Sequence, residues 1–252
     1  MGGYCHDVVV GTAKVTDLQD RPVYGFGQVD RILGLKGGTS ARWIDGYQRG
    51  GRSYPPVIRP ERTGDEIVTW GEFIEARLLA EYRDAGVPLI KMRPAVEKLR
   101  DELNTRYPLA SANTWLAAEG RELVRKVQDD VGLHRRLRLV VVRTDQQMLD
   151  WSPEAQEFSD SLQWDWAKTA KKQRVIASLN PDPTIRDVVV NPLQRFGEPS
   201  AQGVPTEIIR ELYVAGDPIE MIAELYDLAP HVVQAAVRYE LKTADAYASR
   251  AS

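Results

Sequence analysis

Residues 24–47 read YGFGQVDRILGLKGGTSARWIDGY, and this stretch predicts two short helices separated by a glycine turn. Val29, Ile32 and Leu33 recur at helical spacing in its first half. Residues 34–38, GLKGG, then break the helix, because glycine reaches positive φ at little cost. Helix, short glycine turn and helix form the helix-turn-helix signature.

The second helix is expected to begin at Thr39 or Ser40, since a side-chain oxygen there can accept a free backbone N–H. We assign Trp43 and Ile44 to the buried side of this helix and leave Tyr47 open. In helix-turn-helix proteins the first residues of the second helix enter the DNA major groove. The stretch therefore predicts a DNA-binding unit.

The charge pattern agrees with DNA binding. Residues 31–62 carry seven Lys or Arg against two Asp or Glu, although the whole chain has a net charge of −3. A basic island in a slightly acidic protein is suited to attract phosphate. The alternative is an ordinary helical hairpin with a solvated basic face. As candidate DNA contacts we select Lys36, Thr39, Ser40, Arg42, Arg49, Arg52, Arg59 and Arg62.

A wing is expected after the second helix. The β-branched pairs Val57-Ile58 and Ile67-Val68 flank a turn-forming Thr63-Gly64-Asp65, which predicts a two-stranded hairpin. Arg59 and Arg62 would lie on that hairpin and face the DNA backbone. The next helix is indicated by Trp70, Ile74, Leu78 and Tyr82, which recur every four residues.

The fold class predicted is α+β, mainly helical. Residues 1–20 form an N-terminal arm, residues 21–111 a winged helix-turn-helix domain, and residues 112–185 a connector or small β-containing module. Residues 186–241 form a C-terminal three-helix module, with helices starting near Pro205, Pro218 and Pro230. Residues 242–252 are expected to be a frayed tail.

The C-terminal module is acidic, which suits a protein partner or a dimer contact better than nucleic acid.

Catalytic motifs are missing from the sequence. The three histidines show no metal-ligand spacing, and no phosphate-binding loop has its letters in order. We therefore expect no enzyme activity, no metal and no cofactor. No run of eighteen apolar residues and no secretory signal is present, and Cys5 is the single cysteine, so a cytoplasmic protein without a membrane span is expected.

A family resemblance joins the two ends of the chain. The pattern G-V-P-T-x-x-I-x-x-L…A-G-D-P-I-E-x-I…V-x-A-A-x-x-Y-E resembles a small helical domain found in bacterial antitoxins. The pattern Y-G-F…A-R-W-I-x-G-Y resembles the MerR-like helix-turn-helix half of longer members. Together they resemble a VapB-type antitoxin of the long, two-module kind. The family's usual arginine is missing from residues 201–205, AQGVP, so no role of that arginine is carried over. The C-terminal resemblance rests on Gly197, Pro199, Gly203, Pro205, Thr206, Ile208, Leu212, Gly216, Pro218, Ile222, Tyr226, Val233, Ala235, Ala236 and Tyr239.

The resemblance implies two activities. The protein would neutralise a toxin encoded beside it, a PIN-like ribonuclease, and would bind double-stranded DNA of its own promoter as a homodimer. The acidic C-terminal helices are then expected to hold the toxin, because ribonucleases offer basic surfaces. The alternative is a ligand-responsive MerR-like regulator without a toxin, in which Trp151, Trp164 and Trp166 line a sensing pocket. Those tryptophans would otherwise fill a small core or a dimer interface.

Overall fold

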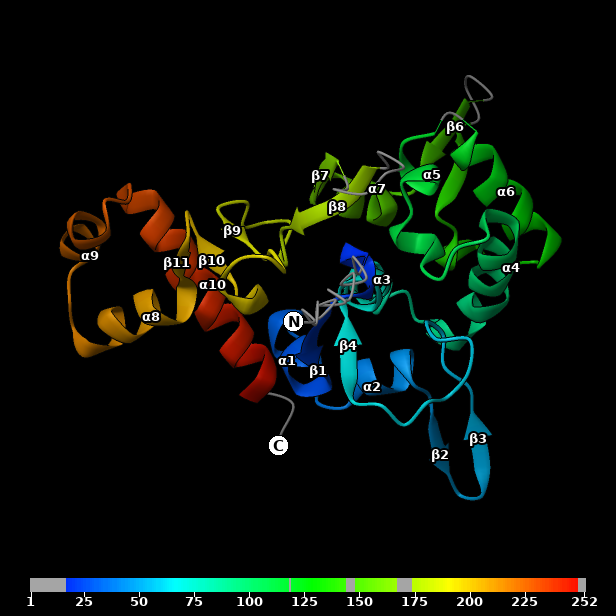
Figure 1. The fold of residues 1–252 in the computed structure, drawn as a ribbon, viewed down its shortest axis with the longest axis horizontal. Helices are drawn as coiled ribbons and strands as arrows, with labels where there is room; N and C mark the ends of the chain where they lie inside the picture. Colours follow the sequence, from blue (N-terminus) through cyan, green and yellow to red (C-terminus); the bar gives the residue numbers. More distant parts are fainter. Residues whose placement is uncertain (1–16, 118, 144–147, 167–173, 249–252) are drawn as a thin grey trace, which may run out of the picture.

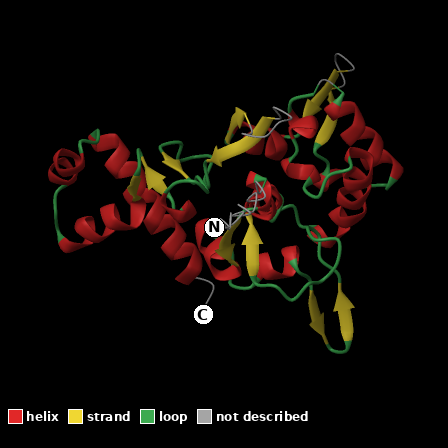
Figure 2. Cartoon of the chain, viewed as in Figure 1, coloured by secondary structure: helices red, strands yellow, loops and turns green. Residues whose placement is uncertain are grey.

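The computed structural model describes residues 17–117, 119–143, 148–166 and 174–248. Its fold is α+β and mainly helical, as the sequence predicts (Figure 2). The helix-turn-helix and the middle of the chain surround a central helix, and the C-terminal helices extend to one side (Figure 1). Most of the predicted N-terminal arm lies outside the described residues.

The N-terminal part follows the predicted helix-turn-helix. After the 3-10 turn η1 (Leu18–Asp20), strand β1 (Pro22–Gly25) leads into α1 (Phe26–Ile32) and then α2 (Thr39–Ile44). A hairpin of β2 (Tyr47–Arg49) and β3 (Arg52–Tyr54) comes next. Strand β4 (Ile67–Thr69) returns to pair antiparallel with β1.

The predicted position of the wing, residues 57–68, is wrong. The amides of Val57 and Ile58 donate to the carbonyl oxygen of Trp43 at 2.8 and 3.0 Å, so these residues cover the end of α2. Ile67 and Val68 pair with β1 instead. The two-stranded hairpin that follows α2 is β2–β3, which begins ten residues earlier.

The central helix is α3 (Trp70–Glu81), and its first ten residues are all buried. A helix that is buried all round lies in the middle of a core and does not line its edge. Thr69 and Glu72 form a capping box that fixes its start. The indole nitrogen of Trp70 donates to the carbonyl oxygen of Ile176 at 2.7 Å, which ties α3 to a strand far away in the sequence.

One hydrophobic core runs from Tyr24 to Val190 and includes α3. It crosses the predicted division between residues 111 and 112, so the middle of the chain shares its core with the helix-turn-helix. The helical elements of this region are η2 (Leu89–Met92), α4 (Arg93–Leu103), η3 (Pro108–Ala110), α5 (Ala112–Trp115), α6 (Gly120–Asp130), η4 (Arg135–Leu137) and α7 (Pro153–Asp160). Its strands form the antiparallel pairs β5 (Val140–Arg143) with β6 (Met148–Trp151), and β7 (Leu162–Trp166) with β8 (Arg174–Leu179).

The C-terminal module contains the three predicted helices, α8 (Thr206–Ala215), α9 (Ile219–Tyr226) and α10 (Pro230–Ala248). They enclose a second core that includes Ile209, Ile222 and Val233. Three short strands precede these helices in the sequence: β9 (Val188–Val189), β10 (Ser200–Ala201) and β11 (Val204–Pro205), with η5 (Arg195–Gly197) between β9 and β10. They form one sheet with β10 in the middle. The expected frayed tail is wrong from residue 242 to 248, because α10 continues to Ala248.

The C-terminal module contacts the helix-turn-helix directly. The hydroxyl of Tyr239 on α10 donates to the carbonyl oxygen of Ile32, the last residue of α1, at 2.9 Å. Arg31 pairs with Glu198 at 2.7 Å, and the hydroxyl of Tyr24 donates to the carbonyl oxygen of Gly197 at 2.6 Å. Helices α1 and α10 therefore lie side by side, as Figure 1 shows.

Candidate nucleic-acid interface

A buried carboxylate holds the turn between α1 and α2. Asp30 is 1% exposed, and its two oxygens accept the backbone N–H groups of Gly38 at 2.6 Å and Ser40 at 2.8 Å. The predicted cap at Thr39 or Ser40 is therefore wrong, because the acceptor at the start of α2 comes from α1. A carboxylate on free helix amides satisfies them and also opposes the positive end of the helix dipole.

Near the start of α2, some of the predicted DNA-contacting residues are exposed and one is buried. Lys36 and Arg42 are exposed, and Thr39 is half-buried with its hydroxyl accepting from Arg42 at 3.0 Å. Ser40 is fully buried, and its hydroxyl donates to the carbonyl oxygen of Phe26 at 2.9 Å. Ser40 thus joins α1 to α2 and is wrong as a DNA contact.

The β2–β3 hairpin, which we call the basic hairpin, projects from the body of the molecule (Figure 1). Gly50 and Gly51 form its turn with φ of 58° and 72°, the left-handed pair that a two-residue hairpin turn requires. Arg49 and Arg52 are exposed and lie directly opposite each other at its tip. Like charges in that position repel each other, and an anion bound between them would remove the repulsion.

An aromatic stack lies at the base of the basic hairpin. Tyr47 and Tyr54 face each other across the strands with ring centroids 4.5 Å apart and planes within 5° of parallel. Both rings are half-buried, so Tyr47 supports the hairpin. Between this stack and the arginines lie Gln48 and Ser53, paired and exposed. The sequence prediction missed these two polar side chains because it placed the hairpin elsewhere.

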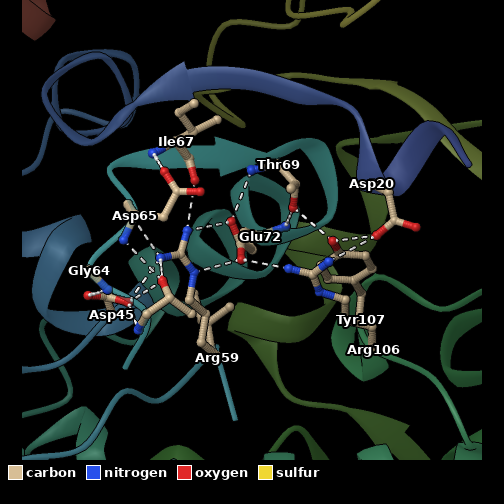
Figure 3. A network of polar contacts seen from close by, with 12 residues as sticks. Asp20, Asp45, Arg59, Gly64, Asp65, Ile67, Thr69, Glu72, Arg106 and Tyr107 are labelled. Carbon is tan, nitrogen blue, oxygen red and sulfur yellow. Dashed lines mark hydrogen bonds and ion pairs between the residues drawn. The ribbon is translucent and has the colours of Figure 1, made fainter. Parts of the chain in front are cut away.

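Arg59 is wrong as a DNA contact, because it lies at the centre of a buried network (Figure 3). Its guanidinium donates to Asp45 at 2.9 Å and to Glu72 at 2.8 and 3.2 Å. It also donates to the hydroxyl of Thr63 and to the carbonyl oxygens of Asp65 and Ile67, at 2.6–2.8 Å. Arg59 is only 5% exposed, so its charge is used inside the fold.

The electrostatics of this network follow from its partners. Burial disfavours the charged form of Asp45, but hydrogen bonds from Thr63, Arg59 and Gly64 outweigh it and hold the pKa of Asp45 below its ordinary value. Burial also opposes the charge of Arg59, whereas Glu72 and Asp45 raise the pKa of Arg59. Arg62 is half exposed at the edge, with its Nε 3.7 Å from Asp45. It stays available to an external anion.

The exposed cations therefore gather on two neighbouring elements. Lys36 precedes α2, Arg42 lies on it, and the hairpin that follows α2 carries Arg49 and Arg52 at its tip. Asp45, the only acidic residue between Lys36 and Tyr54 in the sequence, is buried and paired with Arg59. We call these four exposed cations the basic face, and the sequence between Lys36 and Tyr54 contains no other carboxylate that could neutralise them.

The remaining predictions concern chemistry. In the described ranges, no cluster of three or more His, Cys, Asp or Glu residues is arranged to hold a metal ion. None of the helices in the described part of the chain is long and apolar enough to cross a membrane. The three tryptophans of the expected sensing pocket do not share one environment: Trp151 packs on Trp115, with ring centroids 4.6 Å apart, whereas Trp166 is 59% exposed beside Arg174.

Comparison with known proteins identifies the helix-turn-helix region. Residues 22–96 match a family described as "Putative DNA-binding HTH domain". The match begins at β1 and ends in α4, so it contains α1, α2, the basic hairpin and α3. The chain therefore carries a helix-turn-helix DNA-binding domain.

Two curated relatives come from Mycobacterium tuberculosis. "Uncharacterized protein Rv2308" is 35% identical over 232 residues, which cover 91% of this chain and 94% of that protein. "Putative antitoxin VapB45" is 31% identical over 113 residues, 42% of this chain and 46% of that protein. Among solved structures, Rv2018 from the same organism has a TM-score of 0.67 at 22% identity, covering 86% of this chain and 98% of that one. This last likeness shows a shared fold.

Proposed function

This chain belongs to the family of the mycobacterial protein Rv2308, and we propose that it is a DNA-binding antitoxin that represses its own promoter. In this proposal the basic face binds operator DNA, and the C-terminal module neutralises a protein toxin, a PIN-like ribonuclease. The protein acts as a homodimer in the cytoplasm, without enzyme activity of its own. The partial match to an antitoxin of the VapB type motivates the toxin partner.

The observation that carries DNA binding is the pair of unneutralised arginines at the hairpin tip. Arg49 and Arg52 face each other on a projecting hairpin, and Arg42 is exposed on α2, the helix that precedes this hairpin in the chain. A wing beside a second helix is suited to touch the DNA backbone while that helix lies in the major groove. Each phosphate contact releases counterions and makes the affinity depend on salt.

The test of this assignment is a titration of fluorescent promoter DNA, followed by anisotropy at several salt concentrations. Arg49→Ala combined with Arg52→Ala should lower the slope of log K against log salt by about 2, one unit for each lost contact. The matched control removes two exposed cations outside the matched helix-turn-helix region, Lys126→Ala on α6 with Arg135→Ala on η4. An unchanged slope in the hairpin variant, or an equal loss in the control, would show that DNA binds elsewhere.

The support for a protein partner lies in the surface of α8 and α9. Val214, Met221 and Leu225 are 64%, 57% and 65% exposed, and their helices also carry exposed glutamates. Exposed apolar side chains with an acidic surround suit a partner that is apolar at its centre and basic at its rim. These helices lie far from the basic hairpin, so both surfaces are free to act at once (Figure 1).

The toxin is tested by expressing the neighbouring gene alone and with this chain, and scoring growth and co-purification. We expect rescue by the wild type and loss of rescue by Met221→Asp with Leu225→Asp. Leu116→Asp is the matched control, because Leu116 is 49% exposed at the end of α5, a helix that lies far from α8 and α9 (Figure 1). A harmless neighbour, or one that ignores this chain, would favour a regulator without a toxin partner.

A further inference from the structure

Helix α2 offers few side chains with which to read a base sequence. It has six residues, and Arg42 is the only one of them that is exposed. Ser40 and Ile44 are buried, and the other three residues are half-buried. The turn before α2 adds Lys36 and two exposed glycines. Phosphate contacts position a protein on DNA, whereas the sequence is read by groups that contact base edges. The few exposed side chains of α2 leave most of that reading to another element.

The basic hairpin carries the exposed polar groups that α2 lacks. Residues 48–53 are all exposed. Within residues 36–54, all of which the structure describes, Gln48 and Ser53 are the only uncharged polar side chains that are exposed. The two residues lie directly opposite each other in the β2–β3 pair. No side-chain hydrogen bond joins either of them to another described residue. Their amide and hydroxyl groups are therefore available to an external partner.

The two faces of the basic hairpin differ in chemistry. Successive side chains of a strand point to opposite sides, so residues two positions apart share a face. The aromatic stack and the arginine pair therefore lie on one face, and Gln48 and Ser53 lie on the other. The first face is charged, which suits phosphates, and the second carries neutral hydrogen-bonding groups, which suit base edges.

The turn of the basic hairpin allows a close approach to DNA. The hairpin projects from the body of the molecule, and its turn consists of Gly50 and Gly51 (Figure 1). Glycine has no side chain, so nothing at the tip keeps the backbone away from a ligand. The major groove of B-form DNA admits a two-stranded ribbon. The shape of the hairpin is therefore compatible with entry into that groove.

We propose that Gln48 and Ser53 determine sequence specificity by contacting base edges in the major groove of double-stranded DNA, and that Gln48 selects adenine. A glutamine amide can form two hydrogen bonds with N6 and N7 of adenine. The hydroxyl of Ser53 can donate or accept, so it adds a contact to a neighbouring base. This inference rests on the proposed DNA binding by the basic face. It divides the work between cations that hold phosphates and a neutral pair that reads bases.

The test uses the full chain to select binding sites from a pool of random double-stranded DNA, followed by titration of the selected site at several salt concentrations. Gln48→Ala with Ser53→Ala should reduce the preference for the selected base at one or two adjacent positions by about tenfold. The slope of log K against log salt should stay that of the wild type, because neither residue is charged. Arg49→Ala with Arg52→Ala should do the reverse, with a lower slope and a uniform loss of affinity across sequences.

A change of preferred base gives a second, independent readout. Gln48→Arg should exchange adenine for guanine in the selected sites, because arginine pairs with O6 and N7 of guanine. The matched control is Gln194→Ala with Gln234→Ala, which removes two exposed amides outside residues 22–96 and should select the wild-type sequences. Thermal unfolding should give all these variants a Tm close to that of the wild type, since the substituted side chains are exposed.

The outcomes separate this inference from the proposed function. Wild-type base preferences in both Gln48 variants, together with a lower salt slope in the arginine variant, would refute the role of Gln48 and Ser53 and leave DNA binding by the basic face intact. A wild-type chain that selects no DNA would overturn both.

Discussion

The basic hairpin and residues 55–66, which follow it, each carry two arginines, and the fold uses them differently. In the hairpin, Arg49 and Arg52 are exposed and face each other, and residues 47–54 contain no Asp or Glu. In the following segment, Arg59 is buried between Asp45 and Glu72, and Arg62 lies half exposed beside Asp45. Burial between two carboxylates therefore withdraws Arg59 from DNA, whereas the hairpin arginines and the half-exposed Arg62 remain accessible.

The largest effect is expected at Arg59. Arg59→Met leaves the carboxylates of Asp45 and Glu72 buried without their cation, which should cost about 3–5 kcal/mol of unfolding free energy. Arg62→Met is the matched control and should cost less than about 0.5 kcal/mol, because its ion pair is long and solvated. Urea unfolding measures both. Similar losses in the two variants would mean that burial does not distinguish these arginines.

A second effect concerns Glu75, one turn along α3 from Glu72 but without a cation of its own. Burial raises the pKa of Glu75 to about 8, although a hydrogen bond from the amide of Leu109 opposes the shift. The folded protein then keeps this proton while the unfolded chain releases it near its ordinary pKa of 4.5. The contribution of Glu75 to stability therefore falls as pH rises from about 4.5 to 8.

Glu75→Gln removes that titration and keeps the shape of the side chain. We expect the free energy of unfolding of the variant to rise relative to that of the wild type as pH increases from 5 to 8. Denaturant unfolding at several pH values measures this difference. Glu122→Gln, an exposed carboxylate of α6, should follow the wild-type curve. A constant difference between Glu75→Gln and wild type at all pH values would contradict the raised pKa.

A smaller effect on stability is expected at Asp30, a buried carboxylate whose oxygens accept hydrogen bonds from backbone amides. Asp30→Ala leaves the amides of Gly38 and Ser40 without acceptors and should cost about 1–2 kcal/mol. Asp30→Asn should cost less, since its amide oxygen still accepts one of them. Thermal and urea unfolding distinguish the two variants, and equal losses would argue against the capping role.

The smallest effect on stability is expected in the basic hairpin. Arg49→Ala with Arg52→Ala should change the unfolding free energy by less than about 0.5 kcal/mol, because the pair contributes repulsion. Arg49→Glu places opposite charges across the strands and should be neutral or slightly stabilising. Both variants should nevertheless bind DNA more weakly than the wild type does. A large loss of stability would show that these arginines serve the fold.

Local sequence patterns predicted much of the architecture. The helix-turn-helix followed from apolar spacing and the glycine turn, and α3 from its four-residue repeat. The three C-terminal helices start close to the prolines that indicated them. The position of the hairpin was also within reach, because Gly50-Gly51 between two short polar-aromatic runs is a two-residue turn signal.

Other features depended on partners far away in the sequence. Asp30 reaches the amides of α2, and Tyr239 reaches Ile32 across 207 positions. A cavity lined by α1, α3, α10 and the loop at 181–184 requires these segments together, and no local spacing predicts such a meeting.

The amino-acid sequence was sufficient for the helix-turn-helix, for α3 and the starts of the C-terminal helices, and for the basic and acidic regions, because propensity, periodicity and net charge act over a few neighbouring residues. The tertiary structure assigned the polar side chains their roles: the charge of Arg59 to a buried network, the hydroxyl of Ser40 to the helix junction, and the charges of Arg49 and Arg52 to solvent. The physical reason is desolvation. A charge is withdrawn from water only where distant segments supply hydrogen-bonding partners for it, and those partners meet only in the folded chain.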